Sequence, residues 1–74
     1  MRPTAHEWAD WAHGEICFAG ELPAWLEADP GVALAVKNFD GEDDAITDVW
    51  AAVEFAISEG RVSPPATIPQ RRAP

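Results

Sequence analysis

The chain has a single cysteine, Cys17, among its 74 residues, and no tyrosine. One thiol cannot form a disulfide within the chain, so no covalent link reinforces the core. That core is small, because short chains bury a smaller share of their surface than long ones. Isolated free thiols are typical of reducing compartments. We therefore expect a small cytoplasmic protein that folds by apolar packing.

Long apolar runs are also missing. No strictly apolar stretch exceeds the five residues of segment 32–36, whereas a membrane-spanning helix needs about 20. The first residues lack the basic start and the apolar segment of a secretory signal peptide. The sequence predicts a soluble protein with no membrane partner.

Basic residues are scarce: five Lys and Arg against 13 Asp and Glu give a formal charge of −8. The charge is unevenly distributed, since residues 1–60 hold every acid and two bases (−11), whereas residues 61–74 hold three arginines and no acid (+3). A field of this sign repels the phosphates of nucleic acids. Direct nucleic acid binding is therefore disfavoured, and a partner with a basic surface is favoured.

Motifs for catalysis and cofactor binding are missing too. No serine lies in the Gly-x-Ser-x-Gly setting of a hydrolase nucleophile, and the acids after residue 40 do not fit an EF-hand loop. His6, Asp10, His13 and Cys17 share one face of a predicted helix, but the first and last would lie about 16 Å apart. A solvent-facing polar stripe is the expected role, and metal binding by two neighbours stays open. We expect no enzyme activity and no cofactor.

Capping patterns predict three helices in the first 40 residues. Thr4 and Glu7 form a capping box, which predicts a helix that ends near Ala19. Pro23 favours a short helix over residues 23–28, and the Asp29-Pro30 pair favours a third over residues 30–38. Segment 32–36 also alternates like a strand that pairs with residues 61–63. We prefer the helix, because a lone strand is unstable.

A fourth helix is expected after the Asp40-Gly41 turn, ending at Gly60. Its apolar stripe follows the helical repeat and predicts Trp50 at the centre of the core. The stripe consists of Ile46, Val49, Trp50, Val53 and Ile57. The corresponding face of the first helix is expected to hold Trp8, Trp11, Ala12, Phe18 and Ala19. The predicted fold is therefore an all-α domain of three to four helices over residues 1–60.

The composition changes at residue 61. Four prolines, at positions 64, 65, 69 and 74, oppose helix and strand, and Ile68 is the one large apolar residue after Val62. We expect residues 61–74 to form a flexible, disordered tail.

Acidic residues cluster where the fourth helix starts, at Asp40, Glu42, Asp43, Asp44 and Asp48. Acids at a helix N-terminus are stabilised by the helix dipole, which is an ordinary reason for such a cluster. Here, however, the rest of the domain is acidic as well, whereas typical surfaces mix both signs. Phe55 lies off the apolar stripe and Trp11 lies at the edge of its own. We expect these two aromatics and the acidic cluster to contact a partner.

These observations predict a protein that acts by binding. We expect a small acidic inhibitor or antagonist that occupies the basic, nucleic-acid-binding surface of a larger protein, as anti-CRISPR, anti-restriction and immunity proteins do. The alternative is an accessory subunit or homo-oligomeric adaptor, such as a homodimer, that docks a partner through exposed aromatics.

Overall fold

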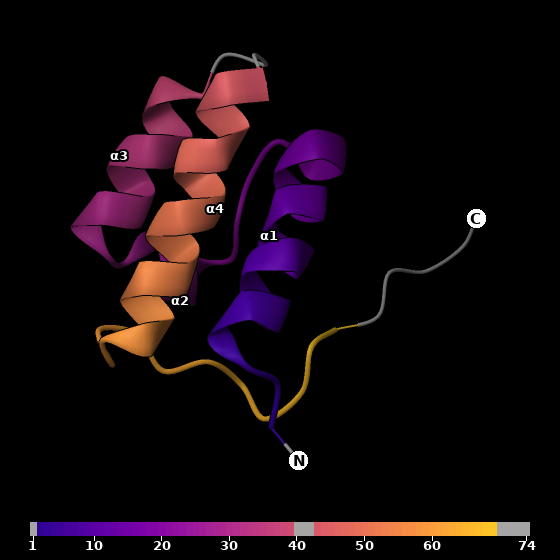
Figure 1. The fold of residues 1–74 in the computed structure, drawn as a ribbon, viewed down its shortest axis with the longest axis vertical. Helices are drawn as coiled ribbons and strands as arrows, with labels where there is room; N and C mark the ends of the chain where they lie inside the picture. Colours follow the sequence, from indigo (N-terminus) through magenta and orange to yellow (C-terminus); the bar gives the residue numbers. More distant parts are fainter. Residues whose placement is uncertain (1, 40–42, 70–74) are drawn as a thin grey trace.

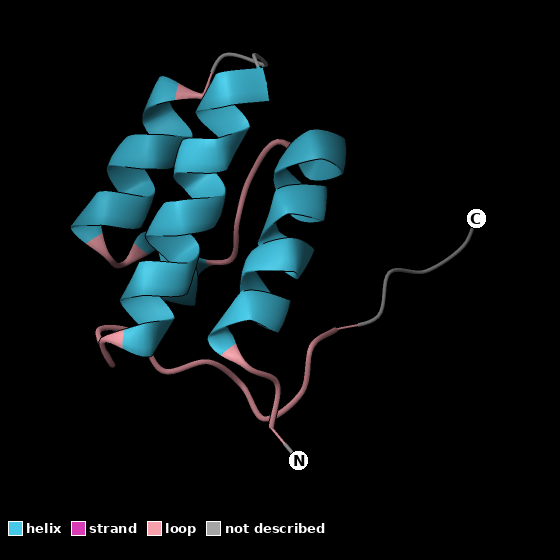
Figure 2. Ribbon diagram, in the orientation of Figure 1, coloured by secondary structure: helices cyan, strands magenta, loops and turns pink. Residues whose placement is uncertain are grey.

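The computed structural model of the chain describes residues 2–39 and 43–69, and for residues 43–45 its backbone alone. These residues form four helices and no strand, which confirms the all-α prediction (Figures 1 and 2). None of the helices in the described segments is long and apolar enough to cross a membrane.

Helix α1 (Ala5–Ala19) begins at the predicted capping box. The Thr4 hydroxyl accepts a hydrogen bond from the backbone N–H of Glu7 at 3.1 Å, and the Glu7 carboxylate accepts one from the Thr4 N–H at 2.8 Å. The helix ends at Gly20, whose φ of 77° is a conformation that glycine adopts without a Cβ clash. The sequence pattern located both ends of this helix.

Two further helices follow with short connections. Helix α2 (Ala24–Glu27) starts after Pro23, and helix α3 (Pro30–Asn38) starts after Asp29. The buried carboxylate of Asp29 accepts hydrogen bonds from the backbone N–H groups of Gly31 at 3.0 Å and Val32 at 3.1 Å. Segment 32–36 is therefore helical, and the alternative strand is wrong because this cap and Pro30 favour a helix start.

Helix α4 (Asp43–Ser58) lies between α1 and α3 and runs antiparallel to both (Figure 1). Backbone bonds from Gly60 to Ile57 and from Arg61 to Ala56 close its C-terminal end, with Gly60 at a φ of 72°. Because α4 is the central helix, its two sides pack against neighbours and one outward arc is left at the surface.

The core forms where the four helices converge. Its largest fully buried side chains are Trp8, Leu26, Val32, Val49 and Val53. Trp8 packs edge to face against Trp11 and Trp25, at ring centroid separations of 5.4 and 5.0 Å. Neither Trp8 Nε1 nor Trp11 Nε1, both buried, has an acceptor among the described residues. Ring packing rather than hydrogen bonding therefore holds these indoles.

Two core predictions are wrong. Phe18 is 79% exposed and Ala19 is exposed, because the buried arc of α1 runs through Ala9, Ala12 and Ile16. Trp50 is half-buried at the edge of the α1–α4 contact, where its Nε1–H donates to Asp10 Oδ1 at 2.9 Å. An indole that keeps its polar edge at the surface satisfies its N–H there, so Trp8 takes the central place instead.

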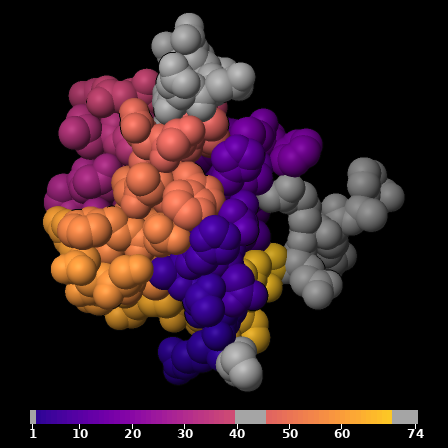
Figure 3. Space-filling model, viewed as in Figure 1, coloured from indigo at the N-terminus to yellow at the C-terminus, as the bar shows by residue number. Residues whose placement is uncertain are grey.

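The segment after α4 packs against the helices for part of its length. Val62 is buried in the core and Ile68 is half-buried. The last described residues, yellow in Figure 3, emerge on the side of α1 opposite α4. The predicted disorder of residues 70–74 lies outside the described residues. The packed part of the chain thus extends at least to Val62.

Replacing Trp8 with Ala should lower the free energy of unfolding by about 3–5 kcal/mol, because the whole indole is buried. Replacing the half-buried Trp50 with Ala should cost less, about 1–2 kcal/mol. Urea unfolding followed by far-ultraviolet circular dichroism measures both. Equal losses would contradict the assignment of Trp8 to the core centre.

The Asp29 carboxylate also binds Arg61, whose Nε lies 3.1 Å from Asp29 Oδ1. Asp29→Ala removes the cap and the ion pair, and should lower the free energy of unfolding by about 2–4 kcal/mol. Asp29→Asn keeps an acceptor for the cap, and Arg61→Ala keeps the whole cap, so each should cost less than half as much. Glu59→Ala, at an exposed neighbouring acid, is the control in the same urea titrations. If Asp29→Ala, Asp29→Asn and Arg61→Ala all lowered the free energy of unfolding by similar amounts, the cap would contribute nothing to stability.

Candidate functional site

The outward arc of α4 carries Asp48, Glu54 and Phe55, which we call the α4 surface. Asp48 and Phe55 are seven residues apart, so they lie on one side of the helix, two turns from each other. Asp48 is exposed, and the Phe55 ring is 55% exposed. The structure therefore brings together two of the residues that the sequence singled out.

Two side chains of α1 adjoin this surface. His6 Nδ1 lies 3.4 Å from Glu54 Oε2, and His6 Nε2 lies 3.5 Å from Asp10 Oδ2. The imidazole also packs edge to face on Trp50, with the ring centroids 5.1 Å apart. The carboxylates of Asp10 and Glu54 are thus held beside one another by contacts between the two helices.

The cation that contacts the α4 surface is already engaged. Arg61 binds buried Asp29, and its guanidinium carbon lies 5.6 Å from the centre of the Phe55 ring. The remaining bases in the described part of the chain are Arg2 and Lys37. No Lys or Arg contacts the carboxylates of Asp48 and Glu54 in the described part of the chain, and Glu54 contacts His6.

A shallow groove of about 270 Å³ lies between α3 and α4, next to Asp48. It is lined by Gly31, Leu34, Ala35, Asn38, Asp48 and Ala52. The Leu34 side chain is 58% exposed beside it. Exposed Asp48 of the α4 surface thus lies beside an apolar groove and the exposed Leu34 side chain of α3.

The acidic cluster is described in part. Asp40 and Glu42 lie outside the described residues, and Asp43 and Asp44 form the first turn of α4, with their backbone alone described. Exposed Asp48 continues the cluster along the helix. Its first four acids remain sequence-based candidates for partner binding.

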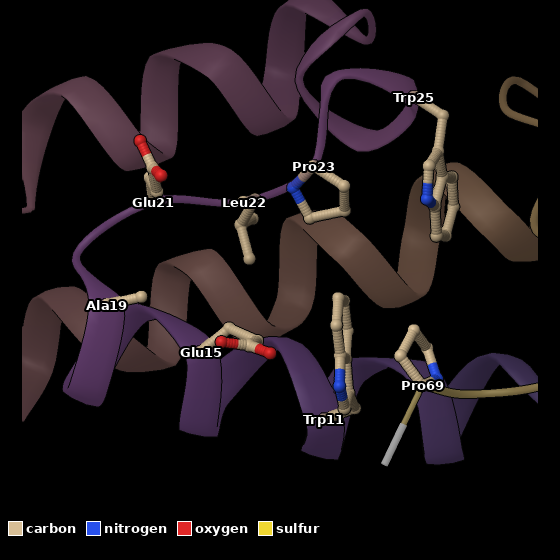
Figure 4. Close-up of a pocket in the computed structure, with 8 residues that line it drawn as sticks. All are labelled: Trp11, Glu15, Ala19, Glu21, Leu22, Pro23, Trp25 and Pro69. Atoms are coloured by element: carbon tan, nitrogen blue, oxygen red, sulfur yellow. The ribbon is translucent and has the colours of Figure 1, made fainter. Parts of the chain in front are cut away.

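Trp11 lies apart from the α4 surface, in a second cavity of about 290 Å³ that we call the tryptophan pocket (Figure 4). The pocket is lined by Trp11, Glu15, Ala19, Glu21, Leu22, Pro23, Trp25 and Pro69. In the close-up, the Glu15 carboxylate points toward Trp11, and Pro69 lies beside the two indoles. The predicted partner-binding residues therefore fall on two separate surfaces.

The polar stripe of α1 forms no metal centre in the described segments, which contain no group of three or more His, Cys, Asp or Glu side chains placed to hold an ion. His6 contacts the Glu54 carboxylate of α4 and the Asp10 carboxylate of its own helix instead. Cys17 is exposed and takes part in no disulfide in the described residues.

Three residues of these surfaces were not predicted from the sequence: Asp10 and Glu54, which both contact His6, and Trp25, which lines the tryptophan pocket. The first two are 44 residues apart, and only the antiparallel packing of α1 on α4 makes them neighbours. An indication was present in the chain, since His6 and Asp10 are spaced to share a helix face. Nothing local indicated that Trp25 faces Trp11 across a cavity.

The chain matches no protein-family model, no curated protein and no solved structure at a significant level of similarity.

Asp48→Asn combined with Glu54→Gln should leave the fold intact and change the free energy of unfolding by no more than about 0.5 kcal/mol, because exposed charges contribute little to stability. Loss of repulsion among the acids should slightly raise the melting temperature at low salt. The difference should vanish at high salt. Melting curves at both salt concentrations measure it, and a drop of several degrees at low salt would contradict the prediction.

Proposed function

We propose that this protein acts by binding, as a small acidic inhibitor or antagonist that occupies a basic, nucleic-acid-binding surface of a larger protein. The observation that supports this function best is the α4 surface, where exposed Phe55 shares the outward arc of the helix with Asp48 and Glu54, while the cation beside the ring, Arg61, is bound by Asp29. Anti-CRISPR, anti-restriction and immunity proteins are functional classes of this kind.

The charge pattern suits a groove that otherwise receives phosphates. Basic grooves attract negative charge over long range, and complementary charge accelerates association. Here the carboxylates stand on helices, so their positions are fixed before binding and little ordering cost arises. Asp10 and Glu54 contribute from two helices. The other acids of the cluster, Asp40, Glu42, Asp43 and Asp44, precede Asp48 closely in the sequence and are proposed from the sequence alone to contact the same partner.

The apolar component gives such a contact its affinity. Phe55 and Leu34 are both more than half exposed, at 55% and 58%. Aromatic side chains in the middle of an interface commonly supply much of the binding energy, whereas charges at its rim act mainly on association rate and specificity. The proposal assigns anchoring to Phe55 and steering to the carboxylates.

These exposed apolar side chains also favour a second candidate function. An accessory subunit or homo-oligomeric adaptor would dock through Phe55 and the groove beside Leu34, with the acids serving for solubility. Such binding would depend little on salt. In a homodimer it would also make the melting temperature depend on protein concentration.

The first experiment is affinity capture from lysate of the source cells, with elution by a salt gradient and identification of the eluted protein. Purified partner is then titrated with the wild type and with Asp48→Asn/Glu54→Gln. We expect the double variant to bind at least about tenfold more weakly and with a flatter salt dependence, because close interfacial charge pairs couple by about 1.5–7 kcal/mol. The wild type should also displace nucleic acid from the partner.

The matched control is Glu7→Gln/Glu27→Gln, which removes the same charge from α1 and α2. Gln at position 7 retains the capping box. We expect the affinity of this control for the partner to lie within about threefold of that of the wild type. The control changes only the overall electrostatic field of the protein and leaves the α4 surface intact. Unchanged affinity in the α4 variant would contradict the inhibitor proposal, and Phe55→Ala would then test the adaptor.

A further inference from the structure

The tryptophan pocket belongs to neither the core nor the α4 surface. Its walls come from α1, from the connection between α1 and α2, from α2 and from Pro69 near the C-terminus (Figure 4). Segments far apart in the sequence thus meet around one cavity. At about 290 Å³, the cavity is at the lower end of the range for ligand sites, about 300–1,000 Å³. This volume suits a small side chain of a partner and the backbone that carries it.

Two indoles from different helices line the pocket. Trp11 comes from α1 and Trp25 from α2, and each is half-buried (Figure 4). Each also packs edge to face against fully buried Trp8. Their positions are therefore fixed by the core, and a ligand finds both rings already oriented.

The rest of the lining is mostly apolar. Besides the indoles it consists of Ala19, Leu22, Pro23 and Pro69, together with Glu15 and Glu21. The Glu21 carboxylate points away from the two indoles in the close-up (Figure 4), and Glu15 already takes part in an interaction. The described lining therefore favours an uncharged, apolar group over a charged one.

The chain itself places proline rings at this site. Pro23, just before α2, and Pro69 both line the cavity, and Pro69 lies beside Trp11 in the close-up (Figure 4). A prolyl ring offers an apolar face to an indole, and its fixed φ leaves little backbone freedom to lose on binding. The two rings do not fill the pocket, since about 290 Å³ remains among these walls. The remaining volume thus has the same kind of wall that already accepts Pro69.

We propose that the tryptophan pocket binds a proline of an extended segment of another protein, with Pro69 as one wall of the site. Proline-rich segments adopt the polyproline II conformation before binding, and they dock in grooves lined by aromatic side chains. The backbone carbonyls of such a segment make no hydrogen bonds among themselves, so they are available to an indole N–H. This contact goes beyond the proposed inhibitor function, because it uses none of the carboxylates of the α4 surface.

The test uses the full chain and a blocked, uncharged six-residue peptide that contains three prolines. The peptide is titrated into ¹⁵N-labelled protein while the indole N–H signals are followed by nuclear magnetic resonance. We expect the signals of Trp11 and Trp25 to shift, with that of Trp50 unchanged as an internal reference. The matched peptide with leucine in place of proline is apolar but lacks the fixed backbone, and should bind at least about fivefold more weakly. Equal binding of the two peptides would overturn the inference, because any apolar segment would then fit.

Pro69→Ala is the pocket variant, and Pro65→Ala, at an exposed proline outside the lining, is its matched control. Each removes one prolyl ring from the same segment and leaves the helices and both indoles in place. The pocket variant should weaken binding of the proline peptide by about two- to fivefold, and the control by less than about 1.5-fold. Tighter binding by Pro69→Ala would overturn the inference, since Pro69 would then compete with the peptide instead of forming a wall. Equal affinities of the two variants would overturn it as well.

A second copy of the chain is another source of prolines, since residues 64–69 contain three. Spectra of the protein alone are therefore recorded over about a hundredfold range of concentration. Indole signals of Trp11 and Trp25 that stay unchanged support a segment of another protein as the occupant. Signals that move toward their peptide-bound positions as the concentration rises would overturn the inference, since a second copy would then fill the pocket.

The outcomes for the two proposals are separable. No shift of Trp11 and Trp25 with the proline peptide, together with salt-dependent partner binding that is lost in Asp48→Asn/Glu54→Gln, overturns the pocket and leaves the inhibitor function in place. Proline-specific shifts, together with partner binding that ignores the α4 variant, support the pocket as a proline site and contradict the α4 surface as the contact.

Discussion

The Asp29 carboxylate links the start of α3 to the segment that follows α4. It is 5% exposed, caps the N-terminus of α3 through two backbone N–H groups, and binds Arg61 after the end of α4. Burial of a charge is costly unless it is compensated, and here two N–H donors and one cation compensate it. This one group therefore adds a polar link between the first turn of α3 and the chain after α4 to the apolar packing of the two helices.

Local patterns predicted most of the backbone, because the determinants of helix ends act within a few residues. The capping box of Thr4 and Glu7, the Asp29-Pro30 pair and the glycines at positions 20 and 60 each mark an end that the structure has. The side of each helix that faces the core was predicted less well. Phe18 and Trp50 share their helix faces with buried residues, yet Phe18 is left 79% exposed and Trp50 is only partly covered by α1. Which side chains are covered depends on the length over which two helices pack against each other.

The candidate site was harder to predict than the fold for the same reason. Sequence analysis found Asp48 and Phe55, which one helix places on one face. It grouped Trp11 with them, although Trp11 faces α2 and lines another cavity. Contacts across α1 and α4 bring Asp10 beside Glu54, and no local pattern contains that information. Residues that are distributed over several elements form one surface only once the helices are packed.

The contact of Arg61 with the Phe55 ring has a consequence for any protein that covers this phenylalanine. The same guanidinium touches the exposed ring on one side and the buried carboxylate of Asp29 on the other. A covering surface removes water from the guanidinium, and in a medium of lower dielectric constant its attraction to Asp29 grows. Occupation of the outer face of α4 would therefore strengthen the Arg61–Asp29 attraction and, through Asp29, reach the first turn of α3.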